Sequence, residues 1–346
     1  MKHVDSKRLK LKFLKDYALT EPLLNKKLLR SLSNRKRKFG CWPNDIKALN
    51  RYGIPYVLFA GGSHHALKKP RKYCKVFYIS NYSHLPLIKC RKSLTVSPMK
   101  ERRTGLTTVL LENNVYAAGG CVNEDESLST AERYDPIINE WTPVASMLIG
   151  HSFHGACAYN DHVYVIGGRI NSIVETYNPI RDKWYRCQNT PSQYWHHGNR
   201  AAVSGASIYS FGVSKNGPMN IRLDAREGQW QKLNNDVNVV GGFEVTSYDH
   251  SLYFSGGYSS KGEGKRECLR FDTRSGWEVL SEMNHGRYGH SALIIQDKLY
   301  VFGGYNNGFV STVEYYDFQE KKWTIDCSVE IAHYQGGAAF IQHPNN

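Results

Sequence analysis

The stretch KLYVFGGYNN, Lys298 to Asn307, ends an apolar, β-prone run on two consecutive glycines. The same pattern of aromatic or aliphatic residues followed by glycine recurs along the chain. The first glycines of successive copies are separated by 44 to 58 residues, and they are Gly61, Gly119, Gly167, Gly212, Gly256 and Gly303. The second glycine is missing only after Gly212, where Val213 stands. A repeat of this period predicts an array of identical supersecondary units.

A second element follows the glycine pairs and is complete in STAERYDPIINEW, Ser129 to Trp141. In four copies an anchor residue lies seven residues before a tryptophan: Tyr134 and Trp141, Tyr177 and Trp184, Leu223 and Trp230, and Tyr316 and Trp323. A fifth copy, Phe271 to Trp277, is one residue shorter. We expect the tryptophans to pack between neighbouring units, since each is a large apolar side chain with a single N–H to satisfy.

The last repeat predicts the structure of one unit. Its segments His290–Gln296, Leu299–Gly304, Thr312–Phe318 and Lys321–Asp326 are expected to form four strands. The glycines then end the second strand, where a backbone free to adopt positive φ can turn sharply. Close to the C-terminus, residues 333–342 read HYQGGAAFIQ, a match to the opening strand of a unit. We therefore predict that residues 336–342 supply the first strand of the first unit, and that a stop codon near Glu330 abolishes folding.

The glycine pair, the Tyr-Asp-Pro turn at Tyr134 and the spaced tryptophan together resemble the kelch repeat, a unit of about 50 residues that forms one blade of a β-propeller. The resemblance extends from about Ile54 to the C-terminus. It implies an all-β fold over residues 51–346: a six-bladed kelch β-propeller closed by its C-terminal strand.

Residues 1–50 carry no repeat and are expected to form a short basic α-helical segment. Leu9, Phe13 and Tyr17 fit one helical stripe, and EPLLNKKLLRSL (residues 21–32) resembles the last helices of the BACK domain that precedes the propeller in kelch-like adaptors. Residues 1 to 103 contain 26 Lys or Arg and 5 Asp or Glu, whereas the remainder contains 19 and 26. We interpret the RKRK run at residues 35–38 as a solvated linker rather than a nucleic-acid contact.

Composition favours a protein of the cytoplasm, with the nucleus as the alternative. The eight cysteines are scattered and include no Cys-x-x-Cys pair, which is typical of free thiols in a reducing compartment. Lysines interrupt the N-terminal residues throughout, so we expect neither a secretory signal nor a membrane partner. No motif indicates a cofactor or a metal site.

Candidate binding residues come from the loops. In a four-stranded antiparallel meander, the link between strands two and three and the link to the next blade emerge on one face, so both loop sets should line one mouth of the ring. The residues that directly follow the glycines form the first set. The second set lies thirteen to sixteen residues before the first glycine of each copy. Together they are Ser63, Arg103, Cys121, His151, Arg169, His196, Tyr258, Arg287, Tyr288, Tyr305, Tyr334 and Gln335.

Arg, Tyr and His are common in protein interfaces, so these residues predict a protein-interaction module. The resemblance to kelch-like adaptors implies that the mouth binds peptide motifs of the substrates of a cullin-3 RING ubiquitin ligase. The long loop of the first blade, Ser63–Cys74, is basic, so we expect an acidic partner segment near blade one. Cullin-3 itself would be recruited only through a BTB domain in a longer product. The alternative is an actin-binding or scaffold kelch protein, which co-sedimentation with filamentous actin would detect. A metal-dependent propeller enzyme is the least favoured reading, because no His-Glu-x-x-His or serine elbow is present.

Overall fold

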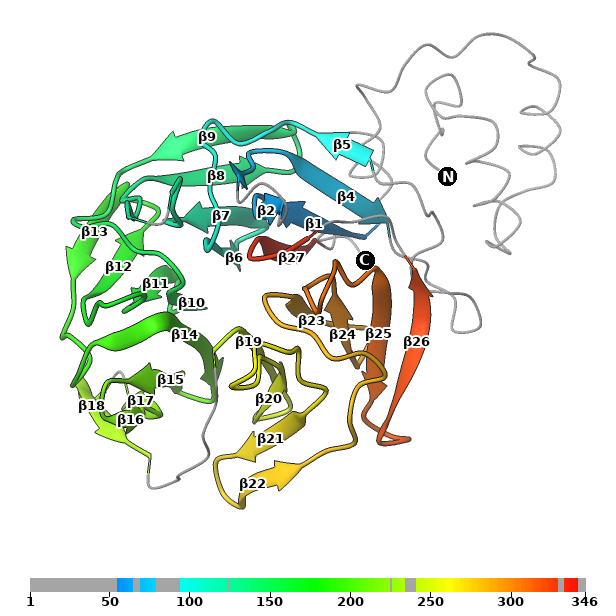
Figure 1. The fold of residues 1–346 in the computed structure, drawn as a ribbon. Coiled ribbons are helices and arrows are strands. Elements are labelled where there is room, and N and C mark those ends of the chain that lie inside the picture. Colours follow the sequence, from blue (N-terminus) through cyan, green and yellow to red (C-terminus); the bar gives the residue numbers. More distant parts are fainter. Residues whose placement is uncertain are drawn as a thin grey trace, which may run out of the picture.

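The computed structural model describes residues 55–64, 69–78, 94–123, 125–224, 226–233, 241–328 and 333–341. Within these ranges every regular element is a β-strand, and six sheets surround one axis as the blades of a propeller (Figure 1). The predicted all-β, six-bladed architecture is confirmed. The basic segment of residues 1–50 lies outside the described residues. No described helix is long and apolar enough to cross a bilayer.

The first three blades contain four strands each. Blade one consists of β27 (Gly337–Ile341), β1 (Tyr56–Ala60), β4 (Cys74–Tyr78) and β5 (Leu94–Val96), with a small hairpin of β2 (Ser63–His64) and β3 (Lys69–Pro70) beside it. Blade two consists of β6 (Thr107–Leu111), β7 (Asn114–Ala118), β8 (Ala131–Asp135) and β9 (Glu140–Val144). Blade three consists of β10 (Gly155–Tyr159), β11 (His162–Ile166), β12 (Val174–Asn178) and β13 (Lys183–Arg186).

The other three blades repeat this order. Blade four consists of β14 (Tyr194–Ser204), β15 (Ser207–Ser214), β17 (Ile221–Asp224) and β18 (Gln229–Lys232), and β16 (Gly217–Pro218) pairs with β15. Blade five consists of β19 (Phe243–Tyr248), β20 (Ser251–Gly256), β21 (Cys268–Asp272) and β22 (Gly276–Val279). Blade six consists of β23 (Ser291–Ile295), β24 (Lys298–Phe302), β25 (Thr312–Asp317) and β26 (Lys322–Ser328), which confirms the four strands predicted for the last repeat.

Strand register explains the spacing of the anchor residue and the tryptophan. Tyr134 lies directly opposite Trp141 in the β8–β9 hairpin, and their ring centroids are 5.1 Å apart. The equivalent pair in blade six, Tyr316 and Trp323, is also directly opposite. The shortened copy keeps the pairing of Phe271 with Trp277, because only its turn has lost a residue. Cross-strand pairs of aromatic residues stabilise antiparallel sheets, so the spacing is a property of the hairpin.

The ring closes as predicted. β27 pairs antiparallel with β1, from Tyr56 opposite Ile341 to Ala60 opposite Gly337. Figure 1 shows this strand, in red, beside β1, in blue. The innermost strand of blade one therefore comes from the last described residues of the chain, while its other strands come from the first.

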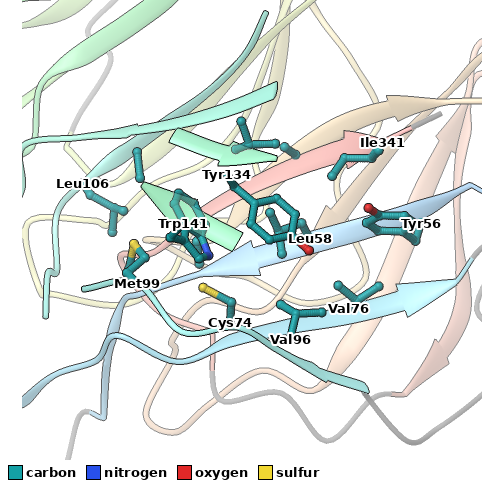
Figure 2. Close-up of a cluster of buried hydrophobic side chains, with 14 residues drawn as sticks. Tyr56, Leu58, Cys74, Val76, Val96, Met99, Leu106, Tyr134, Trp141 and Ile341 are labelled. Atoms are coloured by element: carbon teal, nitrogen blue, oxygen red, sulfur yellow. The ribbon is translucent and has the colours of Figure 1, made fainter. Parts of the chain in front are cut away.

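Apolar clusters fill the spaces between blades. Figure 2 shows the cluster between blades one and two, in which Trp141 is fully buried and packs with Tyr134, Leu58, Cys74 and Met99. Burial of about 200 Å² of indole surface contributes roughly 5 kcal/mol of transfer free energy. The indole N–H groups of Trp184, Trp230 and Trp323 donate to backbone carbonyls. Trp184 donates to the carbonyl of Ala145 at 2.7 Å, and so ties blade three to the chain that leaves blade two.

Candidate functional site

Both predicted sets of loops meet at one mouth of the ring. A cavity of about 500 Å³ opens there, and it is lined from blade one to blade six by residues of the links between strands two and three and of the links between blades. Seven of the predicted binding residues line it: Ser63, Cys121, Arg169, Tyr258, Tyr288, Tyr334 and Gln335. The register on the glycine pairs thus brings these seven residues together in one cavity, and their role in binding stays a prediction.

Six residues at the starts of the blades have left-handed backbones, and four of them line the cavity. Each blade contributes one of these residues, and their φ angles lie between 52° and 73°. They are Gly105, Phe153, Gly198, Gly242, Gly289 and Gln335. Backbone hydrogen bonds join four neighbouring pairs of them. Gln335 N–H donates to the carbonyl of Gly289 at 2.9 Å, and Gly105 N–H donates to that of Gln335 at 2.8 Å. A Cβ atom at Gly289 would lie 2.7 Å from the ring of Tyr334, so glycine there makes room for a side chain of the mouth.

Four tyrosines form a continuous aromatic surface on blades five, six and one, which we call the tyrosine cluster. Tyr288 lies at its centre, with ring centroids 5.6 Å from Tyr258, 5.8 Å from Tyr305 and 5.7 Å from Tyr334. Edge-to-face pairs at these distances are favourable. Burial raises the pKa of Tyr258, Tyr288 and Tyr334, so their phenols stay neutral near pH 7. Gln335 Nε2 donates to the phenol oxygen of Tyr334 at 3.0 Å.

Two arginines line the cavity from blades three and four. Arg169 follows the glycine pair of blade three, and Arg200 lies on β14. Arg200 Nε donates to Glu244 of β19 at 3.1 Å, and both side chains are largely buried. No aspartate or glutamate is among the described residues that line the cavity. The mouth therefore combines an aromatic side with a side that carries positive charge.

Three predicted binding residues, Arg103, His151 and Arg287, are buried inside the blades. Arg287 donates to the carbonyl of Gly303 at 3.0 Å and to Glu314 at 2.5 Å. Arg103 repeats both bonds in blade two, with Gly119 and Glu132. The nitrogens of His151 face Gly167 and Glu175 in blade three. These side chains do not line the cavity, because each points into its blade and contacts a buried carboxylate. We therefore leave all three out of the binding surface proposed below.

Glu132, Glu175 and Glu314, which we call the strand-three carboxylates, were not identified from the sequence. Each also accepts backbone N–H groups from the segment that enters its blade. Glu314, for example, accepts from Asn284 at 2.6 Å and from His285 at 3.1 Å. The available signal was a glutamate two residues before the anchor tyrosine in ERY, ETY and EYY. A buried charge is normally paired with an opposite charge. The arginine in the link before a blade and the glutamate on its third strand therefore belong to one pattern.

The remaining predicted residues have different positions. Tyr305 is absent from the cavity lining but lies in the tyrosine cluster. Ser63 and Cys121 line the cavity with little exposed surface. The side chain of His196 lies outside the described residues, as do residues 65–68 of the first blade's loop. Within the described ranges, no group of three His, Cys, Asp or Glu side chains could hold a metal ion.

Comparison with known proteins agrees with the blade structure. The Kelch motif model matches residues 102–148, 150–191 and 286–325. These ranges are blades two, three and six, the three that carry strand-three carboxylates. The chain is a kelch-repeat propeller. Blades one, four and five, which lie outside the matched ranges, have Val76, Ile221 and Leu269 in place of the glutamate.

The kelch propeller is distantly related to kelch-like proteins. It is 26% identical to Kelch-like protein 36 of Bos taurus over 253 residues, which cover 66% of this chain and 40% of the relative. Identity with Kelch-like protein 15 of Homo sapiens is 26% over 252 residues, covering 63% and 41%. The propeller thus spans about 40% of the length of these relatives. The solved structure of YjhT has the same fold, with a TM-score of 0.59, 16% identity and coverage of 79% of this chain and 97% of that one.

A kelch propeller is a protein-interaction module and is usually non-catalytic. The segment at residues 21–32 that resembles a BACK domain lies outside both the described residues and the ranges matched by the motif model.

Proposed function

We propose that this propeller recognises substrates for a cullin-3 ubiquitin ligase, as kelch-like adaptors do, and that it binds peptide segments of those substrates in the mouth. The observation that carries the proposal is the cavity of about 500 Å³, where Arg169 lies on one side and the tyrosine cluster on the other. Tyrosine and arginine supply most of the binding energy in many interfaces. The distant similarity to kelch-like proteins supports the adaptor role.

The propeller provides a matched pair of surfaces for the test. Arg169 and Tyr305 belong to the mouth, whereas Ile180 and Arg181 lie in the turn between β12 and β13, at the opposite end of blade three. Ile180 is 93% exposed, so its replacement should not disturb the fold. One variant carries Arg169→Ala with Tyr305→Ala, and the control carries Ile180→Ala with Arg181→Ala.

Affinity purification from cells, followed by mass spectrometry, compares the two variants with the unmodified chain. We expect the mouth variant to lose a set of partners that the control retains, while the thermal unfolding midpoints of the three chains stay similar. Identical partners for all three chains would place binding outside the mouth and reject the proposal. We expect no cullin-3 with any of them, because its recruitment requires a BTB domain, and recovery of cullin-3 with this chain would contradict that part of the proposal.

A further inference from the structure

Ile170 has an unusual conformation beside the mouth. Its φ is +53°, in the left-handed region, and its side chain is 52% exposed. A β-branched residue rarely adopts this backbone, which favours glycine or asparagine. The corresponding residues of other blades, which also lie two positions after the second glycine, are Val122, Ser259 and Asn306, and none of them has a positive φ. Among these four blades, the strain is therefore particular to blade three.

Neighbouring blades hold this loop in place. Arg169 N–H donates to the carbonyl of Ser152 at 2.8 Å, and Ile170 N–H donates to that of Tyr194 at 3.0 Å. The two bonds connect consecutive residues to the segments that begin blades three and four. The position of Ile170 is thus fixed by its backbone, and its half-exposed side chain adds little to the core. Strained residues that the surrounding structure holds in place are concentrated at binding sites.

Charge on the cavity lining indicates what would bind beside Ile170. Arg169 contributes positive charge on this side, whereas the charge of Arg200 is paired with Glu244 of β19, and no carboxylate is among the described lining residues. A guanidinium group forms its strongest hydrogen bonds with carboxylates. The adjacent exposed isoleucine would gain from covering an apolar side chain.

We propose that the Arg169–Ile170 loop determines specificity, by recognising a partner segment in which an acidic residue is next to a large apolar residue. The carboxylate binds Arg169 and the apolar side chain packs on Ile170. This inference rests on the proposed function, since it requires a peptide in the mouth. It also places the acidic part of the partner at blade three, rather than at blade one, where the basic loop Ser63–Cys74 predicts it.

Two variants separate the parts of the loop. Arg169→Gln removes the charge and keeps a polar side chain of moderate length. Ile170→Asn removes the apolar surface but suits the left-handed backbone, so the thermal unfolding midpoint should stay the same or rise by about 2–4 °C. Arg181→Gln and Ile180→Asn are the matched controls, because they change the same residue types at the opposite end of the same blade.

The probe is a phage-displayed library of random peptides, selected on the full chain and then measured by fluorescence polarisation. We expect selected peptides to share an acidic residue beside Leu, Ile, Val or Phe. Arg169→Gln should weaken their binding by about tenfold or more, and Ile170→Asn by about fivefold, while both controls bind normally. Tyr258 lies on the far side of the cavity. Peptides that lose affinity for the Tyr258→Ala variant are identified as binding in the mouth.

The outcomes distinguish the two proposals. Peptides that lose affinity with Tyr258→Ala, but share no acidic-apolar pair and bind both loop variants normally, would overturn this inference and leave peptide binding in the mouth intact. If no selected peptide depends on Tyr258, the proposed function fails, and the inference fails with it. A large drop in the unfolding midpoint of Ile170→Asn would show that Ile170 serves the fold, and would also overturn the inference.

Discussion

At the scale of single residues, the decisive contacts are those of two strand-three carboxylates, Glu132 and Glu314, with the buried arginines Arg103 and Arg287. Arg287 and Glu314 are both fully buried, and each also bonds the backbone. Moving two charges out of water is costly, and their attraction compensates only when the remaining hydrogen bonds are satisfied. Such a pair therefore adds little net stability when intact, but loss of one member leaves an unpaired charge in the core.

Replacement of Arg287 by methionine should reduce the free energy of unfolding by about 3–5 kcal/mol, because Glu314 would remain buried without its cation. The measurement is urea denaturation followed by tryptophan fluorescence. Arg181→Met, on the exposed turn of blade three, is the control and should change stability by no more than about 0.5 kcal/mol. Equal effects of the two substitutions would show that the buried pair is not needed for folding.

At the scale of elements, the pairing of β27 with β1 holds the two ends of the ring together. β27 forms the inner strand of blade one, and its Ala339 and Ile341 lie in the same apolar cluster as Tyr56 and Leu58. Without β27, the five buried residues of β1 would have an unpaired edge, and blade six would lose its neighbour.

A chain that ends at residue 332 should therefore fail to unfold cooperatively. The reason is that both the strand pairing and the adjoining apolar cluster would be incomplete. Circular dichroism during urea denaturation tests this, and a synthetic peptide of residues 333–346, added in excess, should restore a cooperative transition. A peptide of the same composition in scrambled order is the control. If the shortened chain unfolds with an unchanged urea midpoint, closure by β27 does not stabilise the ring.

At the scale of the whole molecule, three buried histidines lie where one blade meets the next. His154, His290 and His333 have 0 to 2% exposed surface, and burial lowers the pKa of each, to about 3 for His333. Arg71 near His333 and Arg287 near His290 act in the same direction. The folded ring thus keeps these side chains neutral, whereas the unfolded chain binds protons on them below a pH of about 6.5.

The free energy of unfolding should consequently decrease as the pH is lowered through this window. A histidine with a lowered folded pKa contributes fully above about pH 6.5, and its contribution declines by about 1.4 kcal/mol per pH unit until the folded pKa is reached. The urea midpoint of unfolding should decrease as the pH is lowered from 6.5 to 5. It should decrease less steeply in His333→Gln, even if that variant is less stable at pH 7. Parallel pH profiles for the two proteins would exclude His333 as a source of acid sensitivity.

Sequence patterns predicted the blades and the mouth for a physical reason. The glycine pair marks the end of each second strand, so counting from Gly167 placed Arg169 correctly. Counting from Gly303 also placed the backbone of Arg287 beside the mouth, but spacing cannot show that the side chain turns inward toward Glu314. The strain at Ile170 could not be predicted either, since it depends on bonds to Ser152 and Tyr194 from other parts of the chain.

Ring closure also has a consequence for synthesis on the ribosome. β1 emerges early, but β27 follows roughly 280 residues later, which at about 5–20 residues per second is a delay of roughly 15–60 s. During that interval the nascent chain carries an apolar strand, YVLFA, whose final neighbour does not yet exist. Unpaired apolar edges of this kind promote association with other chains. The yield of native protein in cells should therefore depend on chaperones that cover β1 until translation is complete.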